Sequence, residues 1–362
     1  MMTDQAVPKA IEAVLDIARW APSGDNAQPW TFRIISNREV EVLVRRANSN
    51  IYEYRHGEPT LISIGALLEN MEIAAPAFGL KASWRYAGSA DGIDHIVVHF
   101  SDADAVSVSD LFGEIARRSV DRRPFKMRSL TAEQKAQLSE ALHKEMQVQW
   151  YDSLSDRRRI AALSALATNI RLRIPETFAV HRGIVDWENR ESAHGIPSRA
   201  LGLDPLTLRL TRWSLANWSR TKFMNTLGAP YFASLQMDFL PGLFCASYFA
   251  IRLMRRFGEP DAALVQTIQA GQAIQRFWLT ATKLGLVMQP CVAILAFWTY
   301  AAARQEFTVF QKAQKGADKL AMGAEEIFVK NDDIVFLGRI GLPRARSHSR
   351  SVRLPLSQLL GR

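Results

Sequence analysis

The chain has 362 residues, of which 48% are hydrophobic and 22% are charged, so it is large enough to bury a core and is not disordered. Its net charge of +9 and pI of about 9.7 favour an anionic partner, such as nucleic acid, a membrane surface or a phosphorylated cofactor. Two cysteines, Cys245 and Cys291, are too few for a disulfide or metal framework. They fit a reducing compartment, and residues 1–10 lack a signal-peptide pattern, so we expect a cytoplasmic protein.

The first hundred residues predict two helices and four strands. The apolar period of Ala10–Trp20 predicts a first helix. Residues 61–78 are apolar on nearly every face and stop before Gly79, which is typical of a central buried helix that ends at a glycine. Alternating or β-branched runs predict strands at 31–35, 40–44, 82–86 and 95–100.

The rest of the chain predicts further helices at 111–118, after Thr131, and at 156–173, 261–284 and 301–315, with strands at 148–151 and 333–340. Thr131 and Gln134 form a capping-box pattern. Residues 174–230 are broken by prolines and glycines, which suggests an insertion over a site. Residues 239–251 are apolar but too short to span a bilayer, and we interpret them as a buried or lid helix, with a membrane-surface role as the alternative.

One internal repeat connects the two predicted buried helices. Gly65–Leu80 aligns with Gly271–Leu286 without a gap, and the glycine at the start, an alanine and the closing Gly-Leu pair are identical. Two buried helices can match over so short a length by chance. The match nevertheless predicts a duplicated unit whose two central helices pack together.

The segment between the first helix and the first strand contains the most specific motif, Ala21-Pro22-Ser23-Gly24-Asp25-Asn26-Ala27-Gln28-Pro29-Trp30. Two prolines bracket small, hydrogen-bonding residues that tolerate turns and left-handed backbone. We expect a stiff, folded-back loop that offers hydroxyl, amide and backbone N–H groups to a planar ligand. An ordinary connection capped by Ser23 or Asn26 is the alternative.

The loop resembles the flavin-binding loop of the nitroreductase family, which reads close to A-P-S-x-x-N-x-Q-P-W. A second motif, Arg117-Arg118-Ser119-Val120-Asp121-Arg122-Arg123-Pro124-Phe125, resembles that family's R-x-S-x-R-x-F signature, which binds flavin phosphate and the ring edge. Arginine forks suit phosphate because they donate paired, charge-assisted hydrogen bonds. Here the second arginine comes one residue late, with Asp121 in its place, so either Arg117 or Arg118 is left to pair with Arg122. A solvated Arg-rich turn is the alternative.

The resemblance implies an α+β fold built from two nitroreductase-like halves, each with an antiparallel or mixed sheet flanked by helices. The halves are expected at 1–110 and 111–362, the second with an insertion or lid around 174–260, and they would pack as a single-chain pseudo-dimer. Double-length chains occur in the Acg-like branch of the family, which the segment Trp187–Leu203 also resembles.

The basic C-terminal stretch resembles the family's closing segment, whose basic residues help bind flavin phosphate. Arg344, Arg346, Arg350 and Arg353 are the candidates, and a solvated tail is the alternative for any one of them. The predicted cofactor-binding residues are Pro22, Ser23, Gly24, Asn26, Gln28, Arg117, Arg118, Ser119, Arg122, Arg346 and Arg350. We expect no metal site and no amino-acid catalyst, because in flavin enzymes the cofactor carries the hydride.

The first functional hypothesis is an FMN-dependent oxidoreductase of nitroreductase type, with NADH or NADPH as hydride donor and a nitroaromatic or quinone as acceptor. The second is a flavin-binding protein that stores or sequesters FMN without turnover, and the third is a basic module that binds nucleic acid or an anionic surface. We expect a small-molecule acceptor as partner, neither nucleic acid nor a membrane, and a flavin site that does not require a homodimer.

Overall fold

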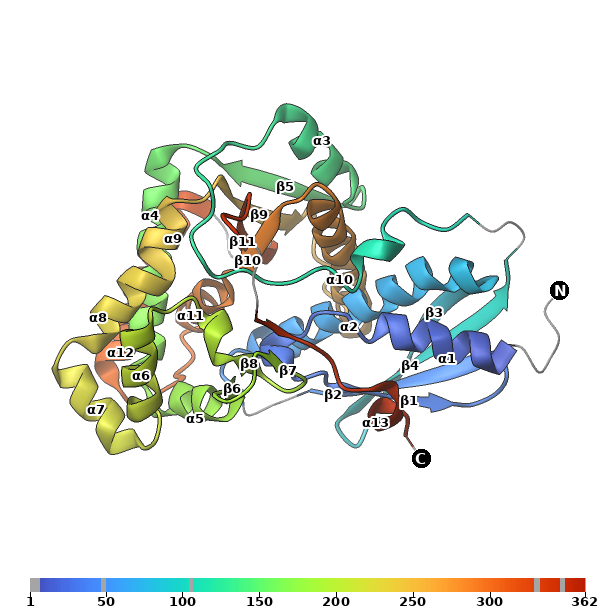
Figure 1. The fold of residues 1–362 in the computed structure, drawn as a ribbon, viewed down its shortest axis with the longest axis horizontal. Coiled ribbons are helices and arrows are strands. Elements are labelled where there is room, and N and C mark those ends of the chain that lie inside the picture. Colours follow the sequence, from blue (N-terminus) through green and yellow to red (C-terminus); the bar gives the residue numbers. More distant parts are fainter. Residues whose placement is uncertain (1–6, 47–49, 104–106, 329–332, 346–348, 362) are drawn as a thin grey trace.

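The computed structural model describes residues 7–46, 50–103, 107–328, 333–345 and 349–361. Within them, two four-stranded antiparallel sheets lie apart from each other, and two long helices, α2 and α10, run between them (Figure 1). The fold is therefore α+β, as the sequence predicts. Three large clusters of buried apolar side chains, and a small fourth one around Ile73 and Leu279, fill the spaces between the sheets and their helices.

The first sheet belongs to the N-terminal part of the chain. Its unit comprises α1 (Val7–Ala18), β1 (Trp30–Ile34), β2 (Glu39–Arg45), α2 (Tyr54–Ala74), β3 (Leu80–Ala90) and β4 (Ile93–Asp102). A short 3-10 helix, η2 (Ala75–Phe78), extends α2 and ends at Gly79, whose φ of 71° is the left-handed conformation that glycine adopts at helix ends. The predicted stop at Gly79 is confirmed.

The second sheet is assembled from strands that are far apart in the sequence. Its unit comprises α3 (Ala132–Glu140), β5 (Met146–Tyr151), β9 (Ser247–Leu253), α10 (Pro260–Lys283), β10 (Val287–Pro290) and β11 (Ile334–Gly341). Thr131 and Gln134 form both hydrogen bonds of the predicted capping box at the start of α3.

The two units have the same topology. Each runs helix, strand, strand, long helix, strand, strand along the chain. In space the first sheet has the order β1-β2-β4-β3 and the second the order β5-β9-β11-β10, so strands that correspond in the chain also occupy corresponding places.

The second unit differs from the first by two groups of extra helices. Between β5 and β9 lie α4 (Leu154–Arg171), α5 (Pro175–Ile184), α6 (Pro205–Ser214), α7 (Trp218–Thr226), α8 (Ala229–Ser234), the π-helical turn η5 (Leu235–Phe239) and α9 (Leu240–Leu243). Between β10 and β11 lie α11 (Val292–Ala302) and α12 (Gln311–Phe328). Short elements complete the chain: η1 (Gly24–Asn26), η3 (Phe112–Glu114), β6 (Val185–Asp186), β7 (Glu191–Ser192), β8 (Ile196–Pro197), η4 (Ser198–Leu201), β12 (Arg350–Ser351) and α13 (Leu356–Leu359).

Three predicted elements are wrong in type or extent. The apolar run 239–251 is not one helix, because residues 247–253 are β9, a wholly buried strand of the second sheet, and so they do not belong to an insertion. The predicted helix 111–118 is only the 3-10 turn η3. The predicted helix 301–315 is split, since α11 ends at Ala302 and α12 continues through Gly316 to Phe328.

The central helices α2 and α10 cross at Gly65 and Gly271, the first residues of the internal repeat. A Cβ added to Gly65 would lie 2.0 Å from the carbonyl oxygen of Ile268, and one added to Gly271 would lie 2.3 Å from that of Ile62. Ile62 and Ile268 occupy the same place before their glycines. The contacts are therefore reciprocal, as in an interface with two-fold symmetry.

Polar contacts further along the same helices repeat this reciprocity. Gln275 donates a hydrogen bond of 2.8 Å from Nε2 to Oδ1 of Asn70, and Arg276 forms an ion pair with Glu69. In the repeat, Glu69 aligns with Gln275 and Asn70 with Arg276, so each pair is the counterpart of the other. The residue types differ while the contact positions correspond.

Two further features complete the description. The C-terminal segment crosses back to the first unit, where Leu360 pairs with Phe32 at the edge of β1 and α13 lies beside that strand (Figure 1). Among the described helices, the one that is long and apolar enough to cross a membrane is Tyr54–Phe78, and 78% of its apolar window is buried inside the protein. This is the burial expected of a core helix.

Candidate functional site

The loop after α1 folds back on itself. Asp25, Asn26 and Gln28 all have positive φ, at 52°, 59° and 50°, a conformation that costs energy for residues with side chains and tends to occur at functional sites. The Ser23 hydroxyl oxygen accepts a hydrogen bond of 3.0 Å from the backbone N–H of Gln28. The loop is therefore shaped as predicted, and Pro22, Ser23, Gly24 and Asp25 line a cavity.

Asn26 and Gln28 face away from that cavity. Asn26 donates from Nδ2 to the carbonyl oxygens of Ser192, Ala193 and Val352. Gln28 donates from Nε2 to Ala193 and accepts at Oε1 from the N–H of Leu354. Both side chains are buried. In this structure the two amides hold the loop to the 192–193 and 352–354 segments, which gives them a positioning role, and their contact with a ligand stays a prediction.

The arginine signature divides into an exposed and a buried part. Arg117 is exposed and forms an ion pair of 2.8 Å with Glu114. Arg118 is only 4% exposed and lies over the ring of Trp278, with its Cζ 4.6 Å from the ring centroid. Its Nε and Nη1 have no hydrogen-bond partner among the described residues. The structure thus favours Arg118 over Arg117 as a ligand for an anion.

Two tail arginines approach Arg118. Arg353 is buried and donates from Nε to the carbonyl oxygen of Ala21, at the start of the loop. Arg350 donates from Nη2 to the carbonyl oxygen of Ala116 and lies over Trp20, while its Nε is buried without a partner among the described residues. Burial and then the charges of Arg353 and Arg350 hold the pKa of Arg118 well below its usual range. We call Arg118, Arg350 and Arg353 the arginine cluster.

The remaining predicted residues of the signature lie in different places. Arg122 lines the cavity and donates to the carbonyl oxygen of Ala200, and burial lowers its pKa to about 10 against the opposing charge of Asp25. Asp121, the residue in the unexpected position, accepts hydrogen bonds from Arg123. The hydroxyl of Ser119 makes only a long contact, 3.4 Å, with the carbonyl oxygen of Val120. Arg346 lies outside the described residues.

The cavity has a volume of about 670 Å³, within the range of small-molecule and cofactor sites. The loop, α2, α10, the end of β10 and the helices α5–α8 all contribute to its wall, so it lies between the two units and beneath the extra helices. Trp278 lines the cavity and also carries Arg118 on its ring, and so the arginine cluster is adjacent to the cavity.

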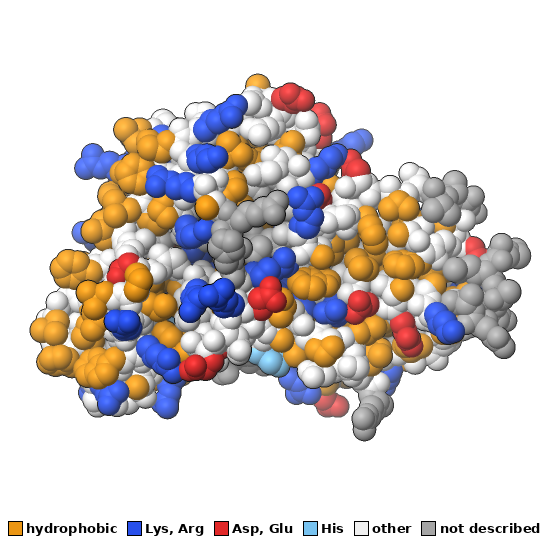
Figure 2. All heavy atoms as spheres, viewed as in Figure 1, with side chains coloured by type: hydrophobic (Ala, Val, Ile, Leu, Met, Phe, Trp, Pro, Cys, Tyr) orange, Lys and Arg blue, Asp and Glu red, His pale blue; other side chains and the backbone are white. Residues whose placement is uncertain are grey.

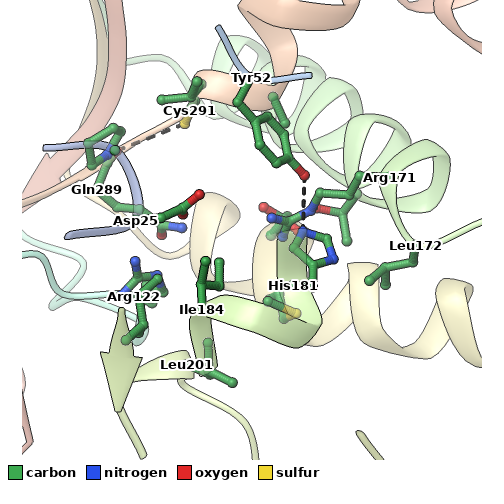
Figure 3. Close-up of a pocket in the computed structure, with 18 of the residues that line it drawn as sticks. Asp25, Tyr52, Arg122, Arg171, Leu172, His181, Ile184, Leu201, Gln289 and Cys291 are labelled. Atoms are coloured by element: carbon green, nitrogen blue, oxygen red, sulfur yellow. Dashed lines mark hydrogen bonds between the residues drawn. The ribbon is translucent and has the colours of Figure 1, made fainter. Parts of the chain in front are cut away.

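A group of polar side chains meets inside this cavity (Figure 3). The hydroxyl of Tyr52 and Nε2 of His181 are 3.0 Å apart, with Arg171 beside them and Asp25 facing them from the loop. Removal from water, and next the charge of Arg171, lower the pKa of His181 to about 3, so this imidazole is neutral at physiological pH. Removal from water raises the pKa of Asp25, and Arg122 and Arg171 oppose this rise.

Sequence reasoning missed most of these cavity residues. Asp25 lies within the predicted loop but was not selected, and Tyr52 follows a segment without a motif. Arg171 lies in the predicted helix 156–173, and His181 lies in the segment 174–230 that prolines and glycines break. They come together through tertiary contacts such as that between Tyr52 and His181 of α5, which no local pattern reports. Within the described residues, no three His, Cys, Asp or Glu side chains form a group able to hold a metal ion.

No protein-family model matches the chain, and no curated protein matches it. Among solved structures, it is similar to a nitroreductase-like protein from Bacillus cereus, with 10% identity, a TM-score of 0.36, and coverage of 71% of this chain and 97% of that one. It is also similar to the FMN-dependent nitroreductase NfnB from Mycobacterium smegmatis, solved with NADPH, with 16% identity, a TM-score of 0.34, and coverage of 68% and 94%. A third similar structure is a candidate nitroreductase from Anabaena variabilis, with 11% identity, a TM-score of 0.37, and coverage of 84% and 69%. At these values the likeness is distant.

Proposed function

We propose that the chain is an FMN-binding oxidoreductase of nitroreductase type. The observation that carries this proposal is the meeting of two motifs from distant parts of the sequence. Loop residues 22–25 line one cavity together with Val120 and Arg122 of the signature, and the buried, incompletely hydrogen-bonded Arg118 lies beside this cavity on the ring of Trp278, although about ninety residues separate the loop from the signature. A buried guanidinium with free N–H groups is costly unless an anion binds it, and a phosphate is the anion that suits its fork.

The described residues fit FMN in both of its parts. The arginine cluster would hold the phosphate, since its three guanidinium groups provide donors and positive charge. The cavity lined by Ser23, Gly24 and Trp278 would hold the flavin ring. When bound, FMN would supply the redox chemistry: its N5 would carry hydride from NADH or NADPH, and its electrons would pass on to a nitroaromatic or quinone acceptor. The residues of the chain would bind and orient the ligands, and α5–α8 form part of the cavity wall around them.

The two units are proposed to be related halves of a pseudo-dimer, divided near residue 110. The shared topology, the crossing of α2 and α10 at Gly65 and Gly271, and the reciprocal polar pairs support this proposal. Each motif of the site occurs once in the chain. We therefore propose one FMN per chain, bound between the halves, with no homodimer required to complete the site.

A second function, storage of FMN without turnover, is supported by the extra helices. Residues of α5–α8 contribute much of the cavity wall, and so they restrict access of a nicotinamide to a bound flavin. By contrast, the nucleic-acid hypothesis loses support, because several arginines of the signature and tail are buried instead of forming an exposed basic face.

The test is the visible spectrum of the purified protein and its change when reduced nicotinamide is added. A flavin spectrum that bleaches and is restored by an acceptor at catalytic rates supports the oxidoreductase. A flavin spectrum that does not respond to NADH or NADPH supports storage. A colourless protein that fails to bind added FMN would refute both.

A further inference from the structure

We propose that the helices α6–α8 form a docking surface for an anionic membrane. Their outer side carries large hydrophobic side chains that the rest of the chain leaves exposed: Leu206, Leu210, Trp213, Phe223, Leu227, Tyr231 and Phe232. Figure 2 shows hydrophobic side chains gathered at the left of the molecule, over these helices. We call these seven side chains the apolar face. A contiguous group of this kind on a soluble chain marks an interaction site.

Charge identifies the occupant of the apolar face. From 205 to 237 the charged residues are Arg209, Arg212, Arg220 and Lys222, and there is no Asp or Glu. Lys222 and Arg209 are exposed. Aromatic and leucine side chains combined with basic residues and no acids are the composition of helices that lie in the interface of an anionic bilayer.

The packing of these helices fits the same function. None of the residues of α6 is buried, and α7 buries only Thr221. Helices with so little burial gain little stability from packing against the rest of the fold. Their exposed apolar side chains become buried only when a membrane or another molecule covers them.

The apolar face is continuous with the cavity. Leu206, Leu210, Leu227 and Phe232 line the cavity and also belong to the exposed group, with Leu206 66% and Phe232 73% exposed. They therefore stand where the cavity opens outward. On a docked protein this opening would face hydrocarbon, which selects an apolar acceptor of quinone type. This last step rests on the proposed function, whereas the docking itself does not.

The proposal departs from the expectation of no membrane partner. That expectation followed from the absence of a spanning segment, and a membrane-surface role was the alternative for residues 239–251 alone. The composition of 205–237 is visible in the sequence, but whether its apolar residues lie inside or outside depends on how α6–α8 pack.

Flotation with vesicles tests the docking without nicotinamide or acceptor, so its result is independent of the redox proposal. The purified chain is expected to bind vesicles of equal parts phosphatidylcholine and phosphatidylglycerol, and to bind phosphatidylcholine vesicles at least roughly tenfold more weakly. The double variant Phe223→Ser/Tyr231→Ser and the charge variant Arg209→Glu/Lys222→Glu should each lose roughly tenfold or more of the binding. None of these four residues lines the cavity.

A matched control, Met127→Ser/Met254→Ser, removes two equally exposed hydrophobic side chains elsewhere and should bind like the parent chain. Circular dichroism checks that every variant is folded. The proposal is overturned if the parent chain ignores anionic vesicles, or if the two face variants bind as well as the control. It is also overturned if sedimentation shows that the face joins two copies of the chain and is thus covered in solution.

Discussion

Replacing Gly65 by alanine should separate the two central helices. The added Cβ would lie 2.0 Å from the Ile268 carbonyl oxygen, 2.7 Å from the Gln272 nitrogen and 2.7 Å from the Gly271 Cα. All three are backbone atoms, so no side-chain rotation relieves the clash. The helices must move apart by about 1 Å, which forfeits a quarter to a half of the attraction between facing atoms.

The magnitude follows from two opposing effects. Overpacking a core costs about 1–3 kcal/mol when side chains can adjust, and more when backbone must move. Alanine regains about 1 kcal/mol of helix propensity relative to glycine. We therefore expect Gly65→Ala to lower the free energy of unfolding by about 3 kcal/mol. Gly271→Ala should cost a similar amount, since its Cβ would lie 2.3 Å from the Ile62 carbonyl oxygen.

Urea unfolding of the purified variants measures these costs. Because one separation of the helices relieves both clashes, the double variant Gly65→Ala/Gly271→Ala should cost clearly less than the sum of the single variants. The control is Gly183→Ala on α5, where an added Cβ meets nothing within 4 Å, and it should be neutral or slightly stabilising. A Gly65→Ala chain as stable as this control would refute the reasoning about the crossing.

The remaining predictions concern the site. Arg118→Met should weaken FMN binding roughly tenfold to a hundredfold while the FMN-free protein keeps or gains stability, because an unpaired buried charge is removed; Arg117→Met should change neither, as FMN titration and urea unfolding will show. The pKa of His181 is about 3 in the folded chain and about 6.5 in the unfolded chain, so a fall in pH protonates the unfolded state first. Unfolding curves should therefore show that the free energy of unfolding falls by about 2 kcal/mol at pH 5, and that the His181→Gln variant does not show this loss. Gln28→Ala should cost about 2 kcal/mol and make the 349–354 segment more sensitive to protease, because it leaves the N–H of Leu354 unpaired; an unchanged cleavage rate would contradict its anchoring role.

Local patterns were sufficient for much of the fold. The central helices were predicted from their long, largely apolar runs that end at glycines, and Gly79 and Gly285 both have positive φ. Their pairing followed from the repeat. The strand β9 was misassigned because a wholly buried strand is a continuous apolar run, which periodicity does not distinguish from a buried helix.

The site was predictable only where a motif was contiguous. The loop at 22–28 and the signature at 117–123 were found because their residues are neighbours in the sequence. Which members face a ligand depends on tertiary contacts: Nδ2 of Asn26 and the side-chain amide of Gln28 form hydrogen bonds with segments that arrive from 192–193 and 352–354. Arg353 lies in the arginine cluster, and Arg171 and His181 line the cavity, because of how the chain folds. Their spacing in the sequence does not indicate these positions.

The stoichiometry of bound FMN in a form of the chain shown by sedimentation to be monomeric tests the central claim most directly. If one chain contains both motifs of a single site between two related halves, the monomer should bind one FMN, and Arg118 should bind its phosphate. Two flavins per chain, or loss of the flavin whenever the chain is monomeric, would contradict the account.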